Sequence, residues 1–320
     1  MKAIVYRKYG SPDVLKLEEV DKPTPADDEV LVKVHAASIN DWDWGLLRGK
    51  PLINRISGLL RPRHKILGTD VAGRVEAVGK NVTQFQPDDD VFGDLSECGF
   101  GGFAEYVCAR ETALTPKPAS MTFEQAASVP HAAALAVQSL RHKSQIRSGQ
   151  RVLFNGAGGG AGTFAVQIAK SLGAEVTCVD SSMKLDMLSS LGADHVIDYT
   201  REDFTRNGQR YDLIIDVKAR RSVFAYRRAL NPGGICVMVG GSMPRIFLAM
   251  IAGHLFSMIG RKKIGILWHR ANRGLDFVIE LFEAGKVVPV IDKSFTLSEV
   301  GEALRYFGEG KHQGKIVITV

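Results

Sequence analysis

The chain has 320 residues, of which 45% are hydrophobic and 24% are charged, and its formal net charge at pH 7 is +6. This length predicts two domains with one core each, and the balanced composition excludes an intrinsically disordered chain. The cations fall in short local clusters without interleaved aromatic residues, so we expect no nucleic-acid partner.

The residues at the N-terminus and the cysteines indicate the compartment. Residues 1–8 hold too short an apolar run for a signal peptide, which predicts a cytoplasmic protein. The cysteines are scattered and form no Cys-x-x-Cys pair, which argues against a disulfide framework and against a structural zinc site. They are Cys98, Cys108, Cys178 and Cys236.

The first 118 residues predict a β-rich domain, because short alternating or β-branched runs lie between Gly, Pro and Asp turns. The expected strands are 3–6, 15–18, 30–36, 71–78 and 104–107. Residues 41–49 are expected to form a loop with a single helical turn.

The pattern changes to a helical period at Thr122, which begins a capping box, and residues 126–140 predict a helix broken only by Pro130. A parallel β/α pattern follows and predicts a doubly wound sheet. Its expected strands are 152–154, 175–179, 195–197, 211–216, 234–239 and 264–268. Beyond residue 270 we expect a helix at 272–283, a strand at 287–291, a helix at 297–307 and a final strand at 315–320, which should pair with the first domain.

Residues 151–170 read as a strand, a glycine turn and a helix, which is the pattern of a phosphate-binding turn. The residues expected to approach the diphosphate of a dinucleotide are Gly156, Ala157, Gly158, Gly159, Gly160, Ala161 and Gly162. A second apolar run ends at Asp180, where a ribose-binding carboxylate belongs. The alternative interpretation of the glycines is a flexible loop.

Residues 246–259 form an apolar run that is too short to cross a bilayer and is followed by the basic residues 261–263. Three interpretations remain open: a buried or dimer-packing helix, a lid over the substrate, and an interfacial anchor. The last of these predicts a weak contact of residues 246–263 with a membrane surface.

Six segments in register resemble the medium-chain dehydrogenase/reductase superfamily, and in particular its zinc-independent quinone oxidoreductase branch, with 2-alkenal reductases. The matching segments are 37–43, 66–79, 102–106, 155–170, 191–199 and 285–292. The resemblance covers essentially the whole chain. It implies a GroES-like catalytic domain (1–120 and 271–320), a Rossmann domain (121–270) and an active site in the cleft between them. It also implies a homodimer joined at the strand 264–268.

Zinc-dependent members of the superfamily hold the metal with a thiolate and with imidazole or carboxylate groups. Here Ser38 stands at or near the first ligand position, and Gly68-Thr-Asp70 replaces Gly-His-Glu. We therefore expect no catalytic zinc, and we expect Asp70 to organise its loop.

The sequence signals for NADPH and for NADH conflict. The resemblance favours NADPH, with Lys184 pairing with the 2′-phosphate, Tyr199 beside the adenine and Ser181 donating to phosphate. Asp180 instead suits the free 2′-hydroxyl of NADH. A solvated position for Lys184 is the alternative. Gly240 and Gly241 are expected to approach the nicotinamide ribose.

The resemblance makes Asn40 a hydrogen-bond donor to the carbonyl oxygen of the substrate, although a turn asparagine is the alternative. His131 departs from the apolar residue usual after Val129-Pro130 and is a candidate proton donor. Leu135 replaces a threonine that relatives keep near the nicotinamide. Trp42, Trp44 and Trp268 either stack on a flat substrate or pack in the core.

The leading function is transfer of a hydride from NADPH or NADH to a quinone or an α,β-unsaturated carbonyl, without a metal. Two alternatives stay open. One is a zinc-independent alcohol dehydrogenase or acyl-chain reductase on the same scaffold, and the other is a cofactor-binding protein with little turnover.

Overall fold

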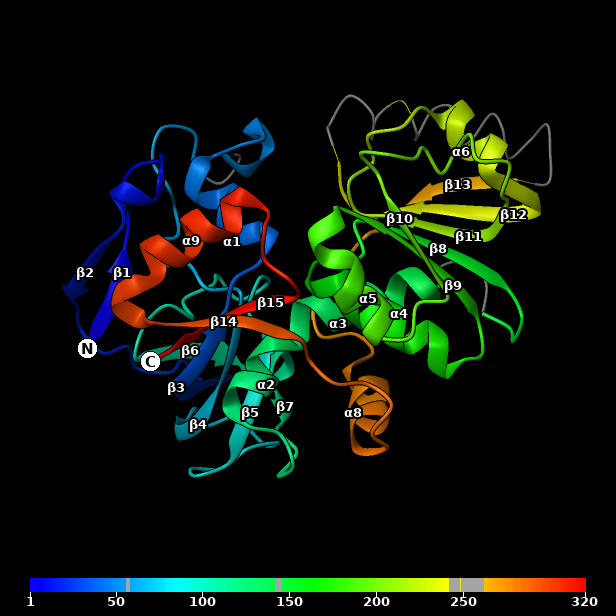
Figure 1. Cartoon of the computed structure of the whole chain (residues 1–320). Coiled ribbons are helices and arrows are strands. Elements are labelled where there is room, and N and C mark those ends of the chain that lie inside the picture. The colour runs from blue at the N-terminus through cyan, green and yellow to red at the C-terminus, as the bar shows by residue number, and fades with distance from the viewer. Residues whose placement is uncertain (56–57, 142–145, 242–247, 249–261) are drawn as a thin grey trace. The chain divides into compact units, whose positions relative to one another are not determined.

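The computed structural model describes residues 1–55, 58–141, 146–241, 248 and 262–320 (Figure 1). The chain divides into two compact units. A β-rich unit comprises Met1–Ala132, Ala271–Leu275 and Pro289–Val320, and a parallel-sheet unit comprises Ala133–Arg270 and Asp276–Val288. Residues 121–132 group with the β-rich unit, because α2 (Phe123–Ser128) packs on several strands of its large sheet. Residues 276–288 group with the parallel-sheet unit.

The β-rich unit is built on one large sheet and one small sheet. Among the described residues, the strand order of the large sheet is β14 (Ile291–Thr296), β15 (Lys315–Thr319), β3 (Glu29–Ser38), β4 (Asp70–Val78), β5 (Asp90–Asp94) and β7 (Thr115–Pro116), and β6 (Tyr106–Arg110) also pairs with β3. The small sheet joins β1 (Lys2–Val5) to β2 (Lys16–Glu19). The final strand β15 runs antiparallel to β3, with Val317 opposite Ser38, which confirms that the chain's last strand pairs with the first domain.

Short helices connect these strands. Helix α1 (Asp41–Arg48) has eight residues, so the expectation of a single helical turn is wrong. The backbone N–H of Asn40 donates to Asp43 Oδ2 at 2.9 Å, and Gly49 ends the helix at φ 58°, so both ends are capped. Helix α9 (Val300–Glu309) follows a 3₁₀ turn at Leu297–Glu299.

The predicted helix over 126–140 is two helices. Helix α2 begins at the expected capping box of Thr122 and Gln125, and α3 (Pro130–Leu140) follows after Val129. Pro130 is the first residue of α3, a position where its missing N–H costs no helical hydrogen bond.

The parallel-sheet unit holds a sheet in the order β10 (His195–Asp198), β9 (Glu175–Asp180), β8 (Arg151–Asn155), β11 (Tyr211–Asp216), β12 (Leu230–Met238) and β13 (Lys263–Ile266) among the described residues. Every neighbouring pair is parallel, which confirms the Rossmann sheet. The edge strand β13 ends at Ile266, so Trp268 lies beyond it. The strand expected at 287–291 is wrong, because the strand there begins at Ile291 and joins the β-rich sheet as β14.

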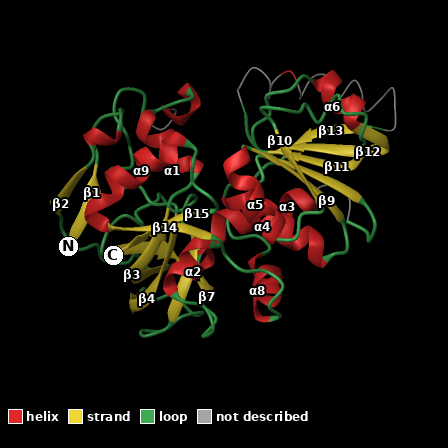
Figure 2. Ribbon diagram, in the orientation of Figure 1, coloured by secondary structure: helices red, strands yellow, loops and turns green. Residues whose placement is uncertain are grey.

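Helices cover both faces of the parallel sheet (Figure 2). Helices α4 (Gly160–Ser171) and α5 (Leu185–Ser190) lie on one face, and α6 (Val223–Ala229) lies on the other. The strand order reverses between the neighbours β8 and β11, and in such sheets ligands bind at the carboxyl ends of the strands at this reversal. Helix α8 (Leu275–Glu283) follows the last strand.

Apart from Leu248, the apolar run 246–259 lies outside the described residues, and so do most residues of the predicted membrane contact at 246–263. Among the residues that the structure does describe, no helix is both long enough and apolar enough to cross a membrane.

Candidate functional site

The glycine turn starts directly after β8 and is tied to the neighbouring strand. Gly156 has φ 85°, and a Cβ there would lie 2.4 Å from Val217 Cγ2, so only glycine fits. The N–H groups of Gly156 and Ala157 donate to Val179 O at 2.9 and 3.3 Å, and that of Gly158 donates to Asp180 Oδ2 at 2.8 Å. The first three residues of the turn therefore use their amides to hold its shape.

The start of α4 offers the free donors. Its first internal hydrogen bond runs from Thr163 N to Gly159 O at 3.0 Å, and no described residue accepts from the amides of Gly160, Ala161 and Gly162. A Cβ at Gly159 would meet no atom within 4 Å, whereas a Cβ at Gly162 would lie 2.2 Å from Ala157 O. This open helix start, with its positive dipole end, suits a diphosphate.

The four residues predicted to choose the cofactor lie at the carboxyl ends of the neighbouring strands β9 and β10. Asp180 Oδ1 accepts from Ser181 N at 2.8 Å, and Asp180 O accepts from Tyr199 N at 3.1 Å. Lys184 is 5% exposed, so the alternative of a solvated lysine is wrong. A Cβ at Gly158 would lie 2.5 Å from Lys184 Cδ, which places the stem of this lysine against the glycine turn.

Gly240 and Gly241 follow β12 and face the loop after β11. A Cβ at Gly240 would lie 2.9 Å from Val217 O, and one at Gly241, where φ is 135°, would lie 2.4 Å from Ala219 Cβ. Both glycines therefore allow close packing of two loops at the carboxyl edge of the sheet.

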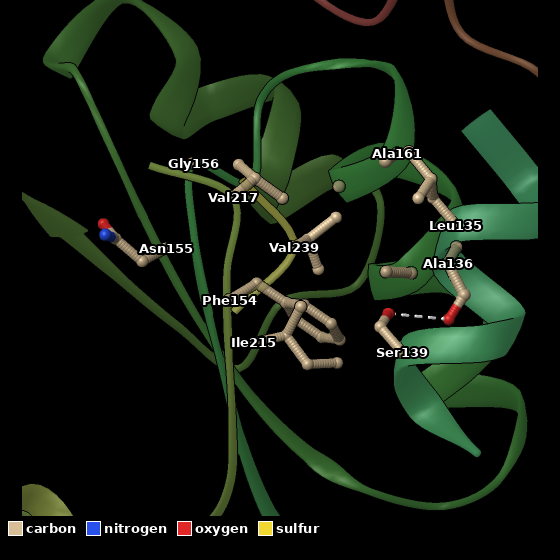
Figure 3. Close-up of a pocket in the computed structure, with 12 residues that line it drawn as sticks. Leu135, Ala136, Ser139, Phe154, Asn155, Gly156, Ala161, Ile215, Val217 and Val239 are labelled. Atoms are coloured by element: carbon tan, nitrogen blue, oxygen red, sulfur yellow. Dashed lines mark hydrogen bonds between the residues drawn. The ribbon is translucent and has the colours of Figure 1, made fainter. Parts of the chain in front are cut away.

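A small apolar cavity of about 10 Å³ lies beside the glycine turn, which is room for a single water molecule (Figure 3). Leu135 of α3 and Ala161 of α4 line this cavity on one side, and Val217 and Val239 line it on the other. The side chain of Asn155 points away, and its Nδ2 donates to Asp216 Oδ2 at 2.9 Å. Leu135 thus adds to an apolar wall and offers no polar group.

The β-rich unit contains a buried polar cluster centred on Asp70, the first residue of β4. Asp70 Oδ2 accepts from Ser38 Oγ at 3.2 Å and from Asn40 Nδ2 at 2.9 Å, and Oδ1 accepts from the backbone N of His131 at 3.1 Å. Burial raises the pKa of Asp70, an effect that the nearby ammonium of Lys315 opposes. Asp70 therefore ties three segments together, as expected for a residue that organises its loop.

Lys315, the first residue of β15, is the member that sequence reasoning missed. It is 2% exposed, and its Nζ donates to Asn40 Oδ1 at 2.6 Å and to Ile39 O at 3.2 Å, and lies 3.5 Å from Asp70 Oδ2. Lys315 and Asp70 together fix the amide of Asn40 and leave it one N–H to donate. The only signal in the sequence was a lysine at the start of an otherwise apolar strand.

His131 and Asp94 form a second buried pair in this unit, with Nδ1 and Oδ2 2.9 Å apart. Burial lowers the pKa of His131, but the hydrogen bond and charge of Asp94 outweigh it and hold that pKa above its ordinary value. Burial raises the pKa of Asp94, but His131 holds it below its ordinary value. The raised pKa of His131 and the lowered pKa of Asp94 both favour the form in which an imidazolium faces a carboxylate.

Asp43 of α1 is buried and accepts from the backbone N–H groups of Asn40 and Gly68, each at 2.9 Å. Burial raises its pKa to about 6, although both hydrogen bonds oppose the shift. Asp43 thereby joins the loop that carries Asn40 to the turn before β4.

The three predicted tryptophans differ in their surroundings. Trp44 packs against the core, and a Cβ at Gly308 of α9 would lie 2.5 Å from its ring. Trp42 is 41% exposed and Trp268 is 76% exposed, the latter in the parallel-sheet unit. Core packing thus accounts for Trp44, while stacking on a substrate stays a prediction for the other two.

The positions that would hold a catalytic zinc do not fit the metal. Ser38 and Thr69 supply hydroxyls in place of a thiolate and an imidazole, and the ammonium of Lys315 already faces the carboxylate of Asp70. A divalent cation at this place would find only weak ligands and would be repelled by the buried ammonium of Lys315.

The chain matches two family models: an alcohol dehydrogenase GroES-like domain at residues 26–119 and a zinc-binding dehydrogenase at residues 191–318. It is 33% identical to the 2-methylene-furan-3-one reductase of Solanum lycopersicum, over 99% of this chain and 79% of the relative. It is 31% identical to the chloroplastic NADPH-dependent alkenal/one oxidoreductase of Arabidopsis thaliana, with the same coverage.

Among solved structures, the quinone oxidoreductase of Coxiella burnetii superimposes with a TM-score of 0.88 at 29% identity, covering 100% of this chain and 99% of that one. This match to a solved structure spans both units described above. The chain therefore belongs to the medium-chain dehydrogenase/reductase superfamily, in its zinc-independent quinone oxidoreductase branch.

Proposed function

We propose that this protein transfers a hydride from NAD(P)H to a quinone or an α,β-unsaturated carbonyl compound, without help from a metal. The observation that carries the proposal is the open start of α4, where three amides without acceptors among the described residues follow a glycine turn. The similarity to reductases of furanones, alkenals and quinones supports a quinone or an α,β-unsaturated carbonyl compound as the substrate.

The dinucleotide would be held by the parallel-sheet unit. Gly159 to Gly162 would donate to the diphosphate, and Gly240 and Gly241 would allow the nicotinamide ribose to approach the backbone. When bound, the reduced nicotinamide supplies the hydride. The residues of the chain bind and orient it.

Asn40 would donate its remaining N–H to the carbonyl oxygen of the substrate, where negative charge develops during reduction. Lys315 and Asp70 act as positioning residues, because they hold both ends of this amide. His131, whose Nδ1 lies 2.9 Å from Asp94 Oδ2, is the candidate that returns a proton to the reduced substrate.

The residues at the end of β9 support NADPH with residual use of NADH. Lys184 lies against the glycine turn and can bring a cation to a 2′-phosphate, while each oxygen of Asp180 already accepts from a backbone amide. With these bonds in place, the main role of the Asp180 carboxylate is to hold the shape of the glycine turn. Lys184→Met should therefore weaken NADPH more than NADH, as measured by titration calorimetry with both cofactors.

The decisive test of the proposal combines binding with turnover. Gly159→Val places a side chain in open space at the helix start, so it should leave the fold intact and weaken NADPH binding by at least tenfold. Gly301→Val in α9, where a Cβ lies 3.6 Å from its nearest neighbour, is the matched control. Unchanged NADPH binding in Gly159→Val would remove the cofactor site from α4.

Oxidation of NADPH and NADH against a panel of quinones, enals and secondary alcohols tests the substrate. We expect turnover with quinones or enals. Turnover confined to alcohols would favour the alcohol dehydrogenase alternative, and tight binding without any turnover would favour the cofactor-binding protein. Full activity in a preparation freed of zinc by chelation is the expected result for a metal-independent reaction.

The homodimer stays a prediction. It is supported by the position of β13 at the edge of the parallel sheet formed by the described strands, since an edge strand offers unpaired backbone groups to a second copy. Sedimentation velocity measures the oligomeric state. The cytoplasmic location also stays a prediction.

A further inference from the structure

Residues 50–55 and 58–65 of the β-rich unit, called the 50–65 loop from here on, lie between α1 and β4 and include a 3₁₀ turn at Leu52–Arg55. Tyr9 Oη donates to Gly58 O at 2.6 Å, and Arg55 Nε donates to Gly49 O at 3.1 Å. At the far end, the backbone N–H of Tyr6 donates to Lys65 O at 2.9 Å. These bonds give the 50–65 loop a fixed base.

The outer part of the 50–65 loop presents large apolar side chains to solvent. Leu52 is 74% exposed, Ile53 51%, Leu59 73% and Leu60 87%. A Cβ at Gly58 would lie 2.2 Å from Arg61 O, so the backbone turns sharply around Leu59 and Leu60. None of these four side chains belongs to the core formed by the described residues of this unit, which makes them available to an apolar partner.

The same stretch carries only positive charge. Between Trp44 and Thr69 the sequence contains no aspartate and no glutamate. Its cations are Arg48, Lys50, Arg55, Arg61, Arg63 and Lys65. Lys50, Arg61, Arg63 and Lys65 are exposed, and within the described part of the chain none of these four has a carboxylate oxygen within 4 Å.

We infer that the 50–65 loop docks on the surface of a membrane that contains anionic lipids. Leucine and isoleucine side chains would enter the boundary between headgroups and acyl chains, while the flexible arginine and lysine side chains would reach back to the lipid phosphates. A second copy of this chain fits less well, because a symmetric contact would bring the same unpaired cations face to face. This surface is separate from the apolar run 246–259.

The test uses the full-length protein and vesicles, without cofactor or substrate, so its outcome is independent of the proposed function. Flotation with vesicles of phosphatidylcholine containing 30% phosphatidylserine should recover the protein, and vesicles of phosphatidylcholine alone should recover several-fold less. Raising the salt concentration should weaken the binding, because screening reduces the attraction between the cations and the lipid phosphates.

Two double variants separate the apolar and the charged contributions. Leu59→Ser with Leu60→Ser should lower the partition coefficient at least tenfold, and Arg61→Gln with Arg63→Gln should lower it about tenfold, most clearly at low salt. Leu17→Ser, at a residue 46% exposed on β2, and Lys8→Gln with Lys16→Gln are the matched controls and should bind as the parent does. Thermal melting verifies that each variant is folded.

Absence of binding to the anionic vesicles, or equal binding by the loop variants and the controls, would overturn the inference. So would a parent dimer that becomes a monomer in Leu59→Ser with Leu60→Ser, as seen by sedimentation velocity, because a second copy would then cover the loop.

Discussion

Replacing Lys315 by methionine tests the polar cluster around Asn40 most directly. Methionine keeps most of the aliphatic stem but removes the ammonium from three buried oxygens: Asn40 Oδ1 at 2.6 Å, Ile39 O at 3.2 Å and Asp70 Oδ2 at 3.5 Å. Removing one partner of a buried ion pair typically costs about 3–5 kcal/mol. For a unit of this size, that loss corresponds to a fall in Tm on the order of 10 °C.

The same variant has a defined dependence on pH. Lys315 is the strongest influence that lowers the pKa of Asp70, so its loss raises that pKa further above the unfolded value. A group with a raised folded-state pKa contributes stability at low pH and loses it as the pH rises through that pKa. The deficit of Lys315→Met relative to the parent should therefore be larger at pH 8 than at pH 5.5, as scanning calorimetry measures.

Three further variants complete this experiment. Asp70→Asn combined with Lys315→Met should be less destabilised at pH 8 than Lys315→Met alone, because no uncompensated charge remains. Lys311→Met removes an exposed lysine that lies 3.0 Å from Glu309, and it should cost less than about 1 kcal/mol. Lys315→Arg keeps the charge and should restore part of the lost stability.

Activity gives a second measure of the positioning role. If Lys315 orients the amide of Asn40, Lys315→Met should lower kcat/KM by roughly 10–100-fold, with partial recovery in Lys315→Arg. A Lys315→Met protein that melts within about 2 °C of the parent at both pH values and keeps its kcat/KM would refute the reasoning.

Three other predictions concern single contacts. Gly162→Val should abolish dinucleotide binding and lower the Tm, because its Cβ would lie 2.2 Å from Ala157 O; calorimetric binding equal to the parent's would contradict this. The stability of the parent should fall as the pH rises from about 6.5 through the raised pKa of His131, and His131→Gln should lack this decline in melts between pH 6 and 9. Tyr226→Phe removes a 2.6 Å hydrogen bond to Asp216 Oδ2 and should cost about 1.5–3 kcal/mol in urea unfolding; an unchanged midpoint would show that this bond adds nothing.

The periodic segments of the fold could be predicted from the sequence, and the errors have physical causes. The apolar run at 287–291 resembles a strand, yet the observed strand β14 is the polar segment Ile291–Thr296, which can be polar because it lies at the edge of its sheet. The expectation of a single turn at α1 falls short because one of the hydrogen bonds that hold this helix in place is distant: Asp43 Oδ1 accepts from Gly68 N, 25 residues away.

The candidate site shows the same division between local and distant information. The glycine turn could be located from local spacing alone, because strand, turn and helix follow each other along the chain. Lys315 could not be found in this way, since it meets Asn40 across 275 residues and only the pairing of β15 with β3 brings them together. The partnership of His131 with Asp94 likewise joins residues 37 positions apart on different elements.

The placement of β15 also determines when the polar cluster can form during synthesis. A ribosome adding about 5–20 residues per second needs roughly 15–55 s to pass from Asn40 to Lys315. During this interval the nascent β-rich unit holds Asn40 and Asp70 without their ammonium partner. The described strands of the parallel sheet end at Ile266, so all of them are translated before Lys315 is added. The parallel-sheet unit can therefore fold first. The β-rich unit, whose synthesis began earlier, is completed only when β15 emerges.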